Sequence, residues 1–214
     1  MTTTAVIFDC DGVLVDTELL SNSVLAELLT RAGLPTTLEQ CLREYRGRSM
    51  TSVMTLATSR HGGPLADDIA ERYYVELKAA FAREGQAVPG VIAALDQITL
   101  PLCVASSGPH HKMAVTLGHT GLWDRFEGRI FSATEVEHGK PAPDLFLHAA
   151  RSMGFDPAST AVVEDSVPGI QAARAAGMRA LAFARDTDAG ELEAAGGEPF
   201  EDMAELPGLL AAQR

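Results

Sequence analysis

The chain has 214 residues, 46% of them hydrophobic and 21% charged, which suits a soluble globular protein with one core and a smaller accessory unit and argues against disorder. Its net charge of -12, with no run of Lys or Arg, disfavours binding to nucleic acid. The three cysteines lack metal-ligand spacing and fit a reducing compartment. With neither a signal-peptide pattern nor a bilayer-spanning apolar run, we expect a cytoplasmic protein that does not enter membranes.

An uninterrupted apolar strand is predicted near the start, at residues 5–8, and it runs directly into a turn that holds Asp9 and Asp11. In open α/β sheets ligands bind at the carboxyl ends of the strands, so these acids lie where chemistry is usually found. Turns at strand ends also favour Asp and Gly, and the segment alone would be consistent with that simpler reading.

A helical segment is predicted next, with leucines at helical spacing, a start at Asp16, Thr17 and Glu18, and a stop at Gly33. Further amphipathic segments cover about residues 37–44, 50–60 and 65–83, without a convincing strand between them. This part of the chain is therefore expected to be a helical insertion.

After residue 89 the pattern changes to strands that alternate with helices. Strands are predicted at 102–105, 130–132, 161–164 and 180–184, and helices after Pro109, Pro143 and Ser166. Residues 189–214 indicate a weak helix, a loop and a last short helix. The alternation predicts an α/β fold with a parallel sheet.

Polar residues follow four of the predicted strands, at what should be one edge of the sheet. They are Asp9 with Asp11, Ser106 with Ser107, Lys140, and Glu164 with Asp165. Each alone has a structural explanation as a turn or cap residue, but that explanation is poor for all four together. The sequence therefore predicts one functional site at this edge.

The acids of this group would repel one another unless a cation neutralised them. Oxygen ligands without nearby His or Cys favour Mg²⁺. We expect a magnesium site formed by Asp9, Asp11, Glu164 and Asp165, with Asp9 and Asp165 as side-chain ligands and Asp11 binding through its backbone carbonyl.

A carboxylate beside such an ion can attack phosphorus, and Asp9 is the candidate nucleophile. Asp11 is the candidate acid and base for the leaving alcohol and the incoming water. Ser106 is the candidate phosphate ligand, with Ser107 and Gly108 beside it at a helix start, although Ser107 could simply cap that helix. Lys140, in a loop rich in proline, would contact the phosphoryl group as a point charge or remain a solvated loop lysine.

Four motifs in this order resemble the haloacid dehalogenase superfamily of phosphotransferases, in particular its β-phosphoglucomutase-like phosphatase branch. They are the segment 9–18, Ser106, Lys140 in its Lys-Pro-Ala-Pro-Asp setting, and Glu164-Asp165-Ser166 with Pro168-Gly169-Ile170. The resemblance implies a Rossmann-like core of residues 1–16 and 89–214, with helices on both faces of the sheet. It also implies an inserted helical cap, residues 17–88, that closes on hinges near Thr17 and Pro89.

Within the cap, the resemblance places a substrate-binding segment at residues 45–50, with Arg46, Gly47 and Arg48 as candidate contacts. Both arginines could instead be solvated charges. Met50 stands where the mutases have an Arg that holds a second phosphate, and Arg46 or Arg48 could replace that Arg from a different position. His110, His111 and Lys112 could contact an anionic end of the substrate or lie at the surface.

We therefore expect a magnesium-dependent phosphatase that hydrolyses a small phosphorylated metabolite, a sugar phosphate or a phosphorylated sugar acid, through an aspartyl-phosphate. The alternatives are a β-phosphoglucomutase-type mutase and a non-catalytic binding protein on the same fold. Haloacid dehalogenation is disfavoured, because dehalogenases lack the second acid that Asp11 supplies here. The particular substrate and the oligomeric state are left open.

Overall fold

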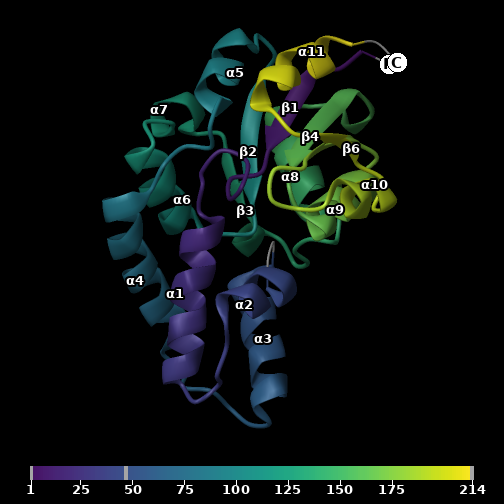
Figure 1. Ribbon diagram of the computed structural model, residues 1–214. Coiled ribbons are helices and arrows are strands. Elements are labelled where there is room, and N and C mark those ends of the chain that lie inside the picture. The colour runs from purple at the N-terminus through teal and green to yellow at the C-terminus, as the bar shows by residue number, and fades with distance from the viewer. Residues whose placement is uncertain (1, 46–47, 213–214) are drawn as a thin grey trace.

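A six-stranded sheet, parallel throughout, forms the centre of the protein in the computed structural model, which describes residues 2–45 and 48–212 (Figure 1). The spatial order is β3-β2-β1-β4-β5-β6. The strands are β1 (Ala5–Phe8), β2 (Leu102–Ser106), β3 (Ile130–Ser132), β4 (Thr160–Glu164), β5 (Arg179–Phe183) and β6 (Glu198–Phe200). The predicted parallel α/β sheet is therefore confirmed.

The register of the sheet sets the position of the loops that follow β1, β2 and β4. Ile7 of β1 is paired with Cys103 of β2 on one side and with Val162 of β4 on the other. The strand order changes direction between β1 and β4, and ligands of doubly wound sheets bind outside the strand ends at such a point. Asp9 and Asp165 follow these two strands.

Helices cover both faces of the sheet, as expected, because successive strand residues point to opposite sides. Val6 and Phe8 face a core closed by α5 (Val91–Gln97), α6 (His110–His119), α7 (Trp123–Phe126) and α11 (Leu206–Ala211). Ile7 faces a second core under α8 (Asp144–Met153), α9 (Val167–Ala175) and α10 (Ala189–Ala194). Short 3-10 helices span Ala133–Glu135, Pro157–Ser159 and Met203–Glu205.

Of the helices described between β1 and β2, the first four form the cap, gathered at one end of the molecule (Figure 1). They are α1 (Glu18–Arg31), α2 (Leu38–Glu44), α3 (Met50–His61) and α4 (Ile69–Glu84). Their apolar faces form a core of their own, which includes Leu28, Leu29, Ile69 and Leu77. The domain limits at residues 17 and 88 remain a prediction.

The edge strand β6 differs from the expectation of a loop in this part of the chain. It has only three residues, one of them Pro199, and it pairs in parallel with β5. A strand so short has no readable alternation, and proline is tolerated at an edge. Among the described residues, no helix is both long and apolar enough to cross a membrane.

Candidate active site

The turn after β1 holds Asp9 against the neighbouring strand β4. Asp9 is 6% exposed, and its backbone N–H donates to the carbonyl of Val163 at 2.9 Å. Gly12 completes the turn at a φ of +79°, and a Cβ at this position would lie 2.2 Å from Oδ2 of Asp165. Only glycine therefore allows the loops after β1 and β4 to approach this closely.

Lys140 joins the ends of β1 and β4. Its Nζ donates to Oδ1 of Asp9 at 2.5 Å and to Oε1 of Glu164 at 2.7 Å, and its side chain is 1% exposed. The alternative of a solvated loop lysine is therefore wrong. Burial would lower the pKa of Lys140, but the attraction of Asp9 and Glu164 raises it above its ordinary value. The lysine is a fixed positive charge at the centre of the site.

Three buried carboxylates lie together beside Lys140. Asp9, Glu164 and Asp165 each offer one oxygen, and these oxygens lie within 4.8 Å of one another. Burial raises the pKa of Asp9 to about 7, with repulsion from Glu164 and Asp11 adding to the effect and attraction from Lys140 opposing it. This set of oxygen donors fits a hard divalent cation.

Within the three, Glu164 already has partners for both carboxylate oxygens. Its Oε1 accepts from Lys140, and its Oε2 accepts from the backbone N–H of Ser166 at 2.7 Å and from the Ser166 hydroxyl at 2.9 Å. Ser166 also caps α9 by accepting from the backbone N–H of Gly169 at 3.2 Å. Glu164 therefore links the cap of α9 to Lys140.

The carboxylate of Asp11 points away from the carboxylates of Asp9, Glu164 and Asp165, and it has two partners of its own. Thr17 donates to Oδ1 at 2.5 Å, and Nζ of Lys112 lies 2.6 Å from Oδ2. Burial would raise the pKa of Asp11, but the charge of Lys112 and the hydrogen bonds from Lys112 and Thr17 lower it below its ordinary value. Asp11 is therefore ionised at neutral pH.

The pairing of Lys112 with Asp11 was missed from the sequence, which suggested a substrate contact or a surface position for the lysine. Its side chain is 12% exposed and comes from the first turn of α6. The chain has only three lysines among its 17 basic residues. The scarcity of lysine in this chain was therefore a signal that could have pointed to Lys112.

The turn after β2 brings Ser106, Ser107 and Gly108 to the same edge. The Ser106 hydroxyl is buried and accepts from the backbone N–H of Gly108 at 3.1 Å. The alternative that Ser107 caps the helix is wrong, because α6 begins at His110 with Pro109 as its N-cap. Ser107 and Gly108 instead line the cavity described next.

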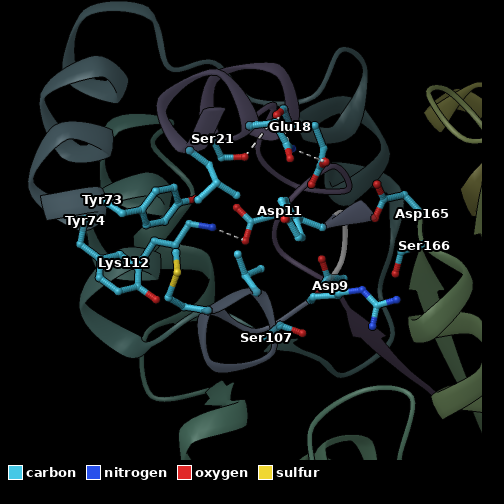
Figure 2. Close-up of a pocket in the computed structure, with 17 residues that line it drawn as sticks. Asp9, Asp11, Glu18, Ser21, Tyr73, Tyr74, Ser107, Lys112, Asp165 and Ser166 are labelled. Carbon is cyan, nitrogen blue, oxygen red and sulfur yellow. Dashed lines mark hydrogen bonds and ion pairs between the residues drawn. The ribbon is translucent and has the colours of Figure 1, made fainter. Parts of the chain in front are cut away.

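A cavity that is partly open to solvent lies between this edge of the sheet and the cap. Figure 2 shows Asp11 inside it, joined to Lys112 by the ion pair. The lining residues fall into two groups. The core contributes Asp9, Asp11, Ser107, Gly108, Lys112, Asp165 and Ser166, and the cap contributes Glu18, Ser21, Asn22, Leu25, Tyr45, Arg48, Met50, Val53, Tyr73 and Tyr74.

The structure places the residues that were predicted to contact the substrate from the cap in different surroundings. Arg48 and Met50 line the cavity, whereas Arg46 and Gly47 lie outside the described residues. His110 instead lies 3.2 Å from a carboxylate oxygen of Glu135, and the His111 ring packs edge-on against Tyr74. Sequence reasoning missed the polar group on α1, formed by Glu18, Ser21 and Asn22, since nothing in the helical pattern showed which side faces the core.

Comparison with known proteins identifies the relatives of this arrangement. The family haloacid dehalogenase-like hydrolase matches residues 3–177. The 6-phosphogluconate phosphatase of Escherichia coli is 31% identical over 98% of this chain and 95% of its own length. Hexitol phosphatase B of the same organism is 29% identical, and the match covers 83% of this chain and 82% of that protein. The fructose-1-phosphate phosphatase YqaB, also from Escherichia coli, is 34% identical, and the match covers 82% of this chain and 93% of that protein.

Solved structures agree with these relatives. A conserved haloacid dehalogenase-like protein from Agrobacterium tumefaciens is 35% identical, with a TM-score of 0.83 and 98% of both chains covered. A candidate β-phosphoglucomutase from Thermotoga maritima is 27% identical, with a TM-score of 0.75 and 98% of both chains covered. The chain therefore belongs to the haloacid dehalogenase-like hydrolases, in the β-phosphoglucomutase-like branch that contains phosphatases of sugar phosphates.

Proposed function

We propose that this chain is a magnesium-dependent phosphatase that hydrolyses a sugar phosphate or a phosphorylated sugar acid through an aspartyl-phosphate on Asp9. The observation that carries the proposal is the position of the Asp9 carboxylate, 2.5 Å from Lys140 on one side and grouped with the carboxylate of Asp165 on the other. A nucleophile for phosphorus needs this setting, because like charges must be offset where an anionic ester approaches an anionic side chain.

Asp9 and Asp165 would hold the metal ion together with the backbone carbonyl of Asp11. Glu164, whose oxygens are bound to Lys140 and Ser166, would support the site by keeping Lys140 in place. Mg²⁺, when bound, would offset the repulsion between acids and phosphate and orient one phosphoryl oxygen.

The first step would form a bond between an oxygen of Asp9 and phosphorus and break the bond from phosphorus to the ester oxygen. Asp11 would donate a proton to the departing alcohol. In the second step water would attack phosphorus and give its proton to Asp11, the bond to Asp9 would break, and inorganic phosphate would leave. Lys140 and the turn at Ser106, Ser107 and Gly108 would bind the phosphoryl oxygens throughout.

The surroundings of Asp11 suit both halves of this cycle. Lys112 and Thr17 keep it ionised in the free enzyme, which is the form required for activating water. A doubly negative ester in the cavity raises its pKa by repulsion and favours the protonated form needed for the leaving alcohol. A mutase would use the same steps. Met50 offers no charge at the position where the mutases hold a second phosphate, and this favours the phosphatase; Arg48, which lines the same cavity, is the charge that a mutase would have to use instead.

A screen of phosphorylated metabolites with Mg²⁺, in which both free phosphate and rearranged sugar phosphate are measured, tests the proposal. We expect phosphate release from at least one sugar phosphate or sugar-acid phosphate, and none from Asp9→Asn. Conversion to an isomeric sugar phosphate with little free phosphate would instead identify a mutase. Ordinary turnover by Asp9→Asn at saturating Mg²⁺ would rule out Asp9 as the nucleophile. A binding protein would release no phosphate with any divalent ion.

A further inference from the structure

The chain enters the cap through residues 12–17 and leaves it through residues 85–88, and these two connections run side by side. The backbone N–H of Asp16, in the first connection, donates to the carbonyl of Gln86, in the second, at 2.9 Å. Asp16 is followed directly by Thr17, the N-cap of α1. The backbone at Asp16 therefore determines where the first helix of the cap begins.

The side chain of Asp16 is held from the core by Arg185, in the loop that follows β5. Nη2 of Arg185 donates to Oδ1 of Asp16 at 2.7 Å, and Nη1 donates to Oδ2 at 3.1 Å. Nε of Arg185 donates to the carboxylate of Asp186 at 2.6 Å, so the guanidinium group is itself held in place. A guanidinium that binds both oxygens of a carboxylate fixes direction as well as distance.

The exposure of this ion pair indicates that it contributes position more than stability. The side chains of Arg185 and Asp16 are 25% and 33% exposed, and ion pairs that water can reach add little to the free energy of unfolding. Either side chain would be hydrated if its partner were removed. The bidentate geometry therefore matters chiefly for where it places the connection to the cap.

The hydroxyl of Thr17 shows what this connection positions. Threonine as an N-cap ordinarily accepts a hydrogen bond from a backbone N–H of the first helical turn. Thr17 makes no such bond, and its hydroxyl instead donates to Oδ1 of Asp11 at 2.5 Å. The direction of this hydrogen bond depends on the backbone next to Asp16. A group that transfers protons works only when it is held at the correct place.

The loop that carries Arg185 also contacts the metal side of the site. Thr187, two residues later, donates from its hydroxyl to the backbone carbonyl of Asp165 at 2.7 Å. The loop after β5 therefore binds both the connection to the cap and the residue that follows Glu164 at the end of β4.

We propose that Arg185 is a positioning residue of the active site: by binding Asp16, it fixes the connection to the cap and keeps the Thr17 hydroxyl directed at Asp11. This inference rests on the proposed phosphatase activity, in which Asp11 transfers the protons. Arg185 is outside the set of described residues that line the cavity, so it acts through the backbone of the connection and not on the substrate.

The kinetic test compares two variants of Arg185 with the wild type on the best ester of the screen in the presence of Mg²⁺. We expect kcat of Arg185→Met to fall by roughly 10-fold or more while KM stays nearly unchanged, because Asp11 is misplaced and the contacts to the phosphoryl group remain. Lysine restores the charge without the bidentate geometry, so kcat of Arg185→Lys should lie between those of Arg185→Met and the wild type. Asp16→Ala should lower kcat as much as Arg185→Met does, and the double variant should be no slower than either single variant.

Arg179→Met is the matched control, because Arg179 lies at the opposite end of β5. Its guanidinium is 2.7 Å from a carboxylate oxygen of Glu198, and the two side chains are 17% and 22% exposed. The variant therefore removes the same kind of ion pair from the edge of the sheet that is far from the site. It should leave kcat at the wild-type value.

Hydrogen–deuterium exchange measures the positioning in the absence of substrate. Peptides that cover residues 12–17 and 85–88 should exchange faster in Arg185→Met than in the wild type, and at the wild-type rate in Arg179→Met. Unchanged exchange or unchanged kcat in Arg185→Met would overturn the inference while the phosphatase stands. An equal fall of kcat in Arg179→Met would also overturn it, because any lost ion pair would then have the same effect. A wild type that hydrolyses no ester would overturn the phosphatase and, with it, this role of Arg185.

Discussion

Replacing Asp9 with Asn should make the metal-free protein more stable above neutral pH, although the same change should abolish turnover. Burial and the nearby acids raise the pKa of Asp9 from 3.8 to about 7, despite the attraction of Lys140. The folded protein therefore holds this proton more tightly than the unfolded chain does. The free energy of unfolding of the wild type falls as pH rises from about 4 to about 7, and the loss is complete above that range.

The size of the effect follows from the same pKa values. A change from 3.8 to about 7 corresponds to about 4 kcal/mol between the ionised and the neutral side chain. This is an upper limit, because relaxation and water penetration reduce the cost of a buried charge. Asparagine is neutral at every pH. The free energy of unfolding of the variant should therefore exceed that of the wild type by up to this amount at about pH 8 and by little at about pH 4.

Urea unfolding with EDTA at both pH values measures this difference. Asp67→Asn is the matched control, because it makes the same change of charge on an exposed acid of the cap and should show no comparable pH dependence. A variant at Asp9 that is less stable than wild type at about pH 8 would mean that the ion pair with Lys140 outweighs burial. A gain that is equal at both pH values would equally refute the reasoning.

Three further predictions concern the metal, the turn and the acid. In differential scanning calorimetry, Mg²⁺ should raise the unfolding temperature of the wild type, and more at about pH 8 than at about pH 6, because the ion competes with the proton on Asp9. The unfolding temperature of Asp9→Asn should be nearly the same with and without Mg²⁺. Gly12→Ala should lower the free energy of unfolding by about 2 kcal/mol or more in urea and weaken Mg²⁺ binding in calorimetric titration, because its Cβ meets Asp165. Lys112→Met should lower kcat at least roughly 10-fold in steady-state assays, with Lys112→Arg partly restoring it, because Asp11 loses its charged partner.

The strand ends of the site could be predicted from the sequence because topology alone brings them together. A buried strand followed at once by Asp9, and another by Glu164 and Asp165, needs no side-chain detail: parallel strands end at one edge, and the change of strand order places these two side by side. The sheet was predicted from the alternation of strands and helices, the cap helices from their amphipathic pattern, and the family from four motifs in order. The roles given to these residues in metal binding and catalysis remain predictions.

Other features depend on side-chain directions that no pattern in one sequence reveals. Lys112 meets Asp11 across 101 residues of chain only because of how α6 is oriented against the turn after β1. The pair of Arg185 with Asp16 likewise becomes visible only when the loop after β5 meets the connection to the cap. The edge strand β6 was missed because three residues carry too little periodicity.

A crystal structure with Mg²⁺ and trifluoroberyllate, a mimic of the transferring phosphoryl group, tests the central claim most directly. The account predicts that beryllium binds an oxygen of Asp9, that the ion contacts Asp9 and Asp165, and that Lys140 contacts a fluoride. Beryllium or the ion bound elsewhere, with Asp9 distant from both, would contradict it.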